Sequence, residues 1–134
     1  MILLYAYIFP DCVMFLSYFG HNRISELPAS FKGAGIAVMD LTYNSISVVP
    51  SSFLAGFSPY TRSFILFDNN QIQSLPEFSS SMPCYALSFS YNNITKIPGS
   101  FSSVSSLNSL FVLSTHSCFN VKLFSRTFFF KQLD

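Results

Sequence analysis

Hydrophobic and polar residues alternate in short stretches that recur along the chain. Each stretch has two apolar residues separated by one residue, as in Ile65 and Phe67, with an asparagine three positions later. Alternation with period two is what a half-buried β-strand requires, because successive side chains point to opposite faces of a sheet. The pattern therefore predicts one short strand before each asparagine. These asparagines are Asn22, Asn44, Asn70 and Asn92.

The recurring asparagines lie 22, 26 and 22 residues apart, and a spacing in the twenties predicts units that stack with their strands parallel. After Asn44, for example, Ile46 and Val49 precede Pro50. We expect the asparagine amide to satisfy backbone groups that the turn leaves unpaired. The aliphatic residues would fill the interior, and proline removes one backbone donor where the chain is irregular.

Four copies of this Asn-Xaa-Ile signature resemble the leucine-rich repeat family over residues 14–112. The resemblance implies an α/β-type solenoid with a curved parallel sheet of four to five short strands. Lys32-Gly-Ala-Gly35 is too short and glycine-rich for a stable helix, so the returns should be mostly non-helical, either extended or 3-10. We expect a fragment of a longer repeat array.

The boundaries of the array follow from where the pattern fails. Residues 1–13 are predicted to be an apolar N-terminal segment or an irregular first coil, residues 14–113 the repeats, and residues 114–134 a degenerate C-terminal tail. Thr115 stands where the next asparagine is expected. Cys84 takes the place of a core leucine, as a small buried hydrophobe.

Four extra residues lengthen the unit between Asn44 and Asn70, within residues 54–61. Gly56 and the Ser58-Pro59 pair indicate a surface bulge in the return. One interpretation is a binding loop that presents Phe57 and Tyr60, and the other is ordinary variation in loop length, which surfaces tolerate.

The inventory of reactive residues argues against an enzyme. The 134 residues have a net charge of +1 and only 10% charged residues, which gives no electrostatic reason to expect nucleic acid. Three widely spaced cysteines and two histidines suggest neither a zinc site nor a disulfide framework. Cys118 lies near His116, but nothing supplies a third, orienting group. We therefore expect no metal, no cofactor and no catalysis.

What remains is a recognition surface. The resemblance implies that strand residues facing away from the core line a concave face, where aromatic and arginine side chains carry interface energy. The predicted function is protein–protein recognition, with a protein ligand as partner. The alternative is a structural spacer within a larger surface or receptor-like protein. The candidate binding residues are Tyr18, His21, Arg23, Asp40, Tyr43, Asp68, Asn69, Gln71 and Tyr91.

Two further features bear on the compartment of the protein and on its assembly. Asn93-Ile-Thr95 is an N-glycosylation sequon in an outward position, which favours an extracellular or cell-surface protein. The apolar run in residues 1–9 is too short for a transmembrane helix and lacks the basic residues and cleavage site of a signal peptide. Uncapped ends of a repeat array also predict self-association.

Overall fold

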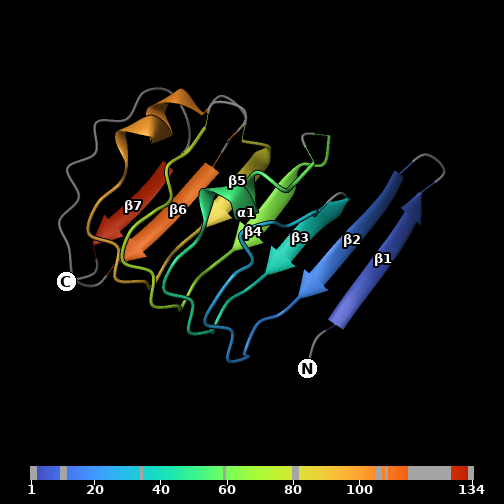
Figure 1. Cartoon of the computed structure of the whole chain (residues 1–134), viewed down its shortest axis with the longest axis horizontal. Helices are drawn as coiled ribbons and strands as arrows, with labels where there is room; N and C mark the ends of the chain where they lie inside the picture. The colour runs from blue at the N-terminus through green and yellow to red at the C-terminus, as the bar shows by residue number, and fades with distance from the viewer. Residues whose placement is uncertain are drawn as a thin grey trace.

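The computed structural model describes residues 3–9, 12–33, 35–58, 60–79, 82–104, 107, 109–114 and 128–132. They form one sheet of seven strands in the order β1-β2-β3-β4-β5-β6-β7 (Figure 1). From β2 to β7 each strand pairs in parallel with the next, as consecutive stacked units require. The prediction of a parallel sheet with few helices is confirmed.

Five strands coincide with the five stretches of alternating residues. The first four each end four residues before their asparagine, and the fifth ends one residue before Thr115. The five strands are β2 (Cys12–Tyr18), β3 (Ile36–Asp40), β4 (Ser63–Leu66), β5 (Cys84–Ser88) and β6 (Ser109–Ser114).

The sheet is wider than the four to five strands predicted. β1 (Leu3–Phe9) pairs antiparallel with β2, and β7 (Phe128–Gln132) pairs parallel with β6. Residues 1–13, predicted as an apolar N-terminal segment or an irregular first coil, and residues 114–134, predicted as a degenerate C-terminal tail, thus each contribute one strand. Both are rich in residues that favour strands, and both add to an edge whose backbone groups would otherwise be unpaired.

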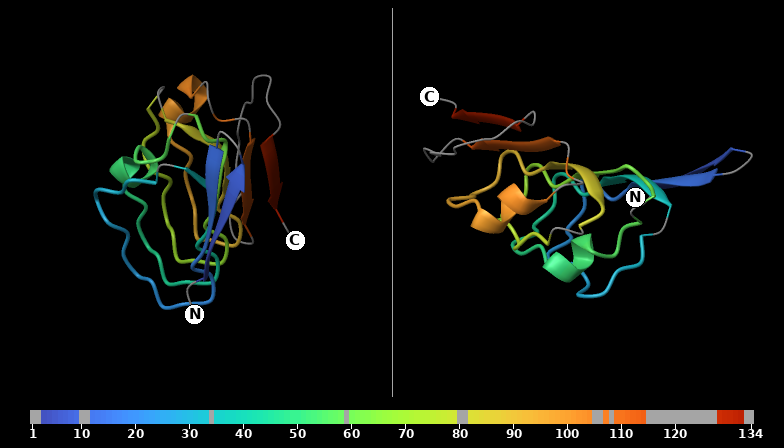
Figure 2. Two further views of the ribbon diagram at one scale, coloured as in Figure 1. Left: turned by 90° about the vertical axis from the view of Figure 1, so that its right-hand side faces the viewer. Right: turned by 90° about the horizontal axis from the view of Figure 1, so that it is seen from above.

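The returns lie on one side of the sheet (Figure 2). Among the described residues they hold one helical turn, α1 (Ser51–Leu54), and one 3-10 segment, η1 (Gly99–Ser103). Pro50 and Pro98 stand just before these segments with φ −64° and −65°, the value that the proline ring imposes. No helix in the described parts of the chain has the length and apolar character needed to cross a membrane.

The core fills the space between the sheet and the returns, and phenylalanine dominates it. The rings of Phe67 and Phe89 stack with centroids 4.9 Å apart, and Phe53 meets Phe67 edge-on at 6.4 Å. All three are fully buried. Ile46, Ile72 and Ile94, two positions after successive asparagines, are buried as well. The side chains that face inward thus follow the repeat pattern.

The extra residues in the second return fold inward. Phe57 is only 3% exposed, because its ring packs against Phe31 and Phe53. The interpretation of a loop that presents Phe57 is therefore wrong, since the ring contributes to the core. Tyr60 is 95% exposed, and Pro59 lies outside the described residues. Gly33 N–H donates to Gly56 O at 2.9 Å and joins this return to the preceding one.

β4 departs from the repeat at its start. Eight residues before Asn70 stands Arg62, where the neighbouring units have Ile36 and Cys84. The chain turns Arg62 outward and buries Ser63, whose hydroxyl donates to Ile36 O at 2.7 Å and to Thr61 O at 3.3 Å. A buried serine is acceptable here because its polar atom is hydrogen-bonded.

Candidate recognition face

The asparagines of the repeat link each unit to the one before it. The Asn70 amide donates to Phe67 O in its own unit and to Leu41 O in the preceding unit, both at 3.0 Å. Its Oδ1 accepts from Ile46 N–H at 2.9 Å, also in the preceding unit. Asn44 and Asn92 repeat this arrangement, with Ile24 and Ile72 as the donors. We call Asn22, Asn44, Asn70 and Asn92 the asparagine ladder.

Asn22 occupies the first position of the ladder and is less buried than the other three. Its amide donates within its own unit, to Phe19 O at 2.7 Å and to Gly20 O at 2.9 Å. Asn44 also donates to Phe19 O at 3.0 Å, so this carbonyl is shared by two units. The turn that follows each strand is therefore held by side-chain amides from both sides.

The residues just before the ladder all have a left-handed backbone. Their φ angles are 54° for His21, 53° for Tyr43, 56° for Asn69 and 56° for Tyr91. This conformation costs roughly 1–2 kcal/mol for a residue other than glycine, and asparagine tolerates it best. Even two tyrosines adopt it here, each directly before an asparagine whose side chain is held by the backbone. We call these four residues the turn column.

The turn column presents aromatic rings to solvent. Tyr43 is 51% exposed and Tyr91 is 47% exposed. The rings of His21 and Tyr43 stack with centroids 4.3 Å apart and planes 10° apart. Because adjacent strands lie about 4.8 Å apart, equivalent rings on adjacent units stack at close to the sheet spacing. The sequence predicted this column as a recognition surface, and the structure brings His21 and Tyr43 into direct contact.

Two carboxylates lie beside the turn column. Asp68 Oδ1 accepts from the Ser88 hydroxyl at 2.5 Å and from Ser90 N–H at 2.6 Å, and Asp40 Oδ1 accepts from Thr42 N–H at 2.9 Å. Burial raises the pKa of Asp68, the hydrogen bonds from Ser88 and Ser90 oppose this, and the charge of Asp40 adds to it. Neither carboxylate forms an ion pair within the described residues.

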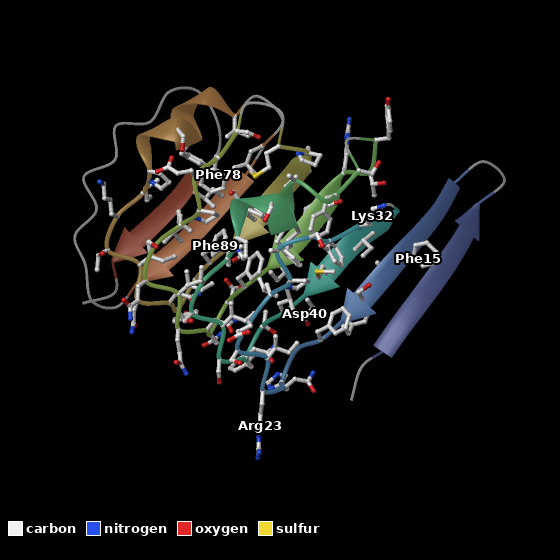
Figure 3. All side chains as sticks on the ribbon, in the orientation of Figure 1. Phe15, Arg23, Lys32, Asp40, Phe78 and Phe89 are labelled. Carbon is white, nitrogen blue, oxygen red and sulfur yellow. The ribbon has the colours of Figure 1, made fainter. Side chains whose placement is uncertain are left out.

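The other predicted residues are spread along the same turns and strands. Arg23, Gln71 and Asn93 are exposed, one column beyond the turn column, and Tyr18 at the end of β2 is half-buried. Figure 3 shows Arg23 extending away from the body of the molecule, with Asp40 at the end of β3. The backbone N–H groups of Gln71 and Asn93 donate to Ile46 O and Ile72 O, both at 2.9 Å, so these positions are rigidly placed.

Sequence reasoning missed a second exposed cluster at the start of β4 and β5. The Arg62 guanidinium carbon lies 5.5 Å from the centre of the Tyr85 ring, and Phe64, 43% exposed, meets the same ring at 5.4 Å. The signal was present in the sequence, since an arginine at a position that is apolar in neighbouring units must turn outward.

The described residues contain no group of three or more histidine, cysteine or acidic side chains placed to hold a metal ion. Burial raises the pKa of the Cys84 thiol to about 12, which keeps it protonated and unreactive at neutral pH. His116 and Cys118 lie outside the described residues. Comparison of the chain with models of protein families, with curated proteins and with solved structures finds no match.

Proposed function

We propose that the chain is a leucine-rich-repeat solenoid, a fragment of a longer array, that binds a protein ligand without catalysis. The observation that supports this most directly is the turn column. A repeat that only had to stack would gain from asparagine or glycine at each left-handed position, because these residues adopt a positive φ at little cost. His21, Tyr43 and Tyr91 accept the strain and place rings in solvent.

Backbone strain that surrounding structure maintains is often associated with function. Rings at these positions are rigid, and tyrosine and arginine supply much of the energy in protein interfaces. The proposed contact surface therefore comprises the turn column with its neighbours Tyr18, Asp40 and Asp68 and the outer residues Arg23 and Gln71. Nucleic acid, a metal or a cofactor has no part in this proposal.

Size limits the expected affinity. The four units that carry the turn column, about 4.8 Å apart, span only about 14 Å, whereas a standard interface covers about 800 Å² on each partner. The chain alone should therefore bind weakly, and further units of a longer array would complete the surface. If the units are structural spacers instead, this surface contributes nothing to binding.

Site-specific photo-crosslinking separates these two functions. A photoreactive residue replaces Gln71, which is exposed beside the turn column, or Val48, which is 66% exposed in the return after Asn44. Recognition predicts a crosslinked protein from Gln71 and none from Val48, with the Gln71 product lost in the double variant Tyr43→Ala and Tyr91→Ala. Equal crosslinking from both positions, unchanged in the double variant, would favour the spacer.

An extracellular or cell-surface location belongs to the same proposal. Asn93 is exposed, so a glycan attached there meets no packed side chain. Expression through a secretory pathway with a supplied leader should add one glycan, which Asn93→Gln removes as a single step in electrophoretic mobility. Self-association through the ends of the array is expected at high concentration, since exposed strand edges pair with other chains.

A further inference from the structure

The turn column has rings at three of its four positions, and the exception lies between two of them. Asn69 follows Tyr43 and precedes Tyr91 in the stacking order of the units. The four residues share one φ within 53–56°, so their side chains leave the backbone at equivalent points. We call Tyr43, Asn69 and Tyr91 the Asn69 step.

The distance between Tyr43 and Tyr91 leaves room for one planar group between their rings. His21 and Tyr43, on adjacent units, stack at 4.3 Å. Tyr43 and Tyr91 are two units apart, which is roughly 9.6 Å at the usual strand spacing, and the described contacts include none between their rings. A flat group placed above Asn69 would lie about 4.8 Å from each ring, the distance at which cations and rings attract one another.

The polar surroundings favour a cation over a neutral ring. Asp68 is adjacent to Asn69 in the chain, and its carboxylate is held by Ser88 and Ser90, next to Tyr91. Asp40 lies on the neighbouring unit, close enough to influence Asp68. Neither acid forms an ion pair within the described residues, and the side-chain amide of Asn69 makes no hydrogen bond there. The unit between the two tyrosines thus offers the side-chain amide of Asn69 and, next to it in the chain, the carboxylate of Asp68.

We propose that the Asn69 step receives an arginine side chain of the protein partner, stacked between Tyr43 and Tyr91. The guanidinium is planar, keeps its charge at all relevant pH values, and stacks on aromatic faces while its edges donate hydrogen bonds. Its N–H groups would donate to Asn69 Oδ1 and towards the Asp68 carboxylate. A lysine ammonium satisfies the charge but not the planar geometry, and a phenylalanine ring satisfies only the geometry. This inference rests on the proposed function and names the group that is recognised.

The probe is N-acetyl-arginine amide, titrated into the full chain while the tyrosine ring resonances and the Asn69 side-chain amide are followed by nuclear magnetic resonance. The wild type should show saturable shifts at these groups, with binding about ten-fold tighter than for N-acetyl-lysine amide or N-acetyl-phenylalanine amide. Equal affinity for all three probes, or no saturable shift with the arginine probe, would overturn the proposal.

Two variants test the site itself. Asn69→Tyr fills the step with a ring, and tyrosine already stands at the same φ in two other units, so the fold should be retained. Affinity for the arginine probe should fall about ten-fold or more. Tyr91→Asn removes one ring with a residue that suits φ 56° and should weaken binding about three-fold to ten-fold. The control Val48→Ala, an exposed residue outside the proposed contact surface, should leave it within about two-fold.

Affinity unchanged in both Asn69→Tyr and Tyr91→Asn would place the arginine elsewhere and reject the step. The two proposals fail separately. A crosslinked partner at position 71 without arginine binding would reject this site and leave the recognition function in place. Arginine binding without a crosslinked partner would support the arginine site and contradict the proposed recognition function.

Discussion

The first unit and the inner units carry the same pattern but are packed differently. Phe19 and Asn22 are half-buried, whereas the equivalent Phe67 and Asn70 are buried. The reason lies in the neighbours. β1 pairs antiparallel with β2 and brings no return with it, so the interior of the first unit is covered by a return on one side only. Inward-facing side chains are thus fully buried where a complete unit covers them on both sides.

The largest expected effect is in the stacked phenylalanines. Phe67→Ala removes a ring that meets both Phe53 and Phe89, and should lower the free energy of unfolding by about 3–5 kcal/mol. Phe19→Ala, in the half-covered unit, should cost roughly half as much. Urea denaturation followed by circular dichroism measures both, and equal losses would contradict the difference between the units.

The asparagine ladder should show the same difference between the first unit and the inner units, with smaller losses in the free energy of unfolding. Asn70→Ala leaves Leu41 O and Ile46 N–H without this partner in the interior and should cost about 2–4 kcal/mol. Asn22→Ala should cost about 1 kcal/mol, because its carbonyl partners lie nearer to solvent. Gln71→Ala, exposed and next to Asn70, should stay within about 0.5 kcal/mol. A larger loss of stability from Gln71→Ala than from Asn70→Ala would mean that Asn70 is not the residue that faces the interior.

The junction between the first two returns can be disrupted at a single glycine. A Cβ at Gly56 would overlap the carbonyl of Phe31, a backbone atom that cannot swing away. Gly56→Ala should therefore destabilise the fold by about 1–3 kcal/mol. Gly99→Ala is the matched control, since a Cβ there meets nothing within 4 Å. It should be neutral or stabilising by up to about 1 kcal/mol, as judged by thermal denaturation.

Burial in an inner unit also predicts a dependence on pH through Cys84. In the unfolded chain its thiol titrates near its ordinary pKa of 9.0, and in the folded chain near 12. Between these values the unfolded state loses the proton first, so stability falls as the pH rises above about 9. At pH 10 the wild type should lose about 1 kcal/mol relative to pH 8, and Cys84→Ala should not show this part of the loss. Identical pH profiles for the two proteins would contradict the burial.

Much of the repeat could be predicted from local pattern. The alternation before each asparagine, and before Thr115 in the fifth unit, predicts the strands β2–β6, because a strand with one face buried needs an apolar side chain at every second position. The buried isoleucines Ile46, Ile72 and Ile94 follow from the same spacing. The candidate face was predicted as columns of residues, since stacked equivalent units place equivalent positions side by side.

The sequence alone determined which residues repeat, and hence the parallel order of the strands, the inward asparagines and the identity of the turn column. Only the tertiary structure decided how each departure from the pattern is accommodated. Phe57 turned inward because Phe31 and Phe53 surround it, and Arg62 turned outward because Ser63 could hydrogen-bond to Ile36 O. β1 and β7 joined the sheet outside the repeat pattern, since the backbone hydrogen bonds at a strand edge are available to any residue except proline.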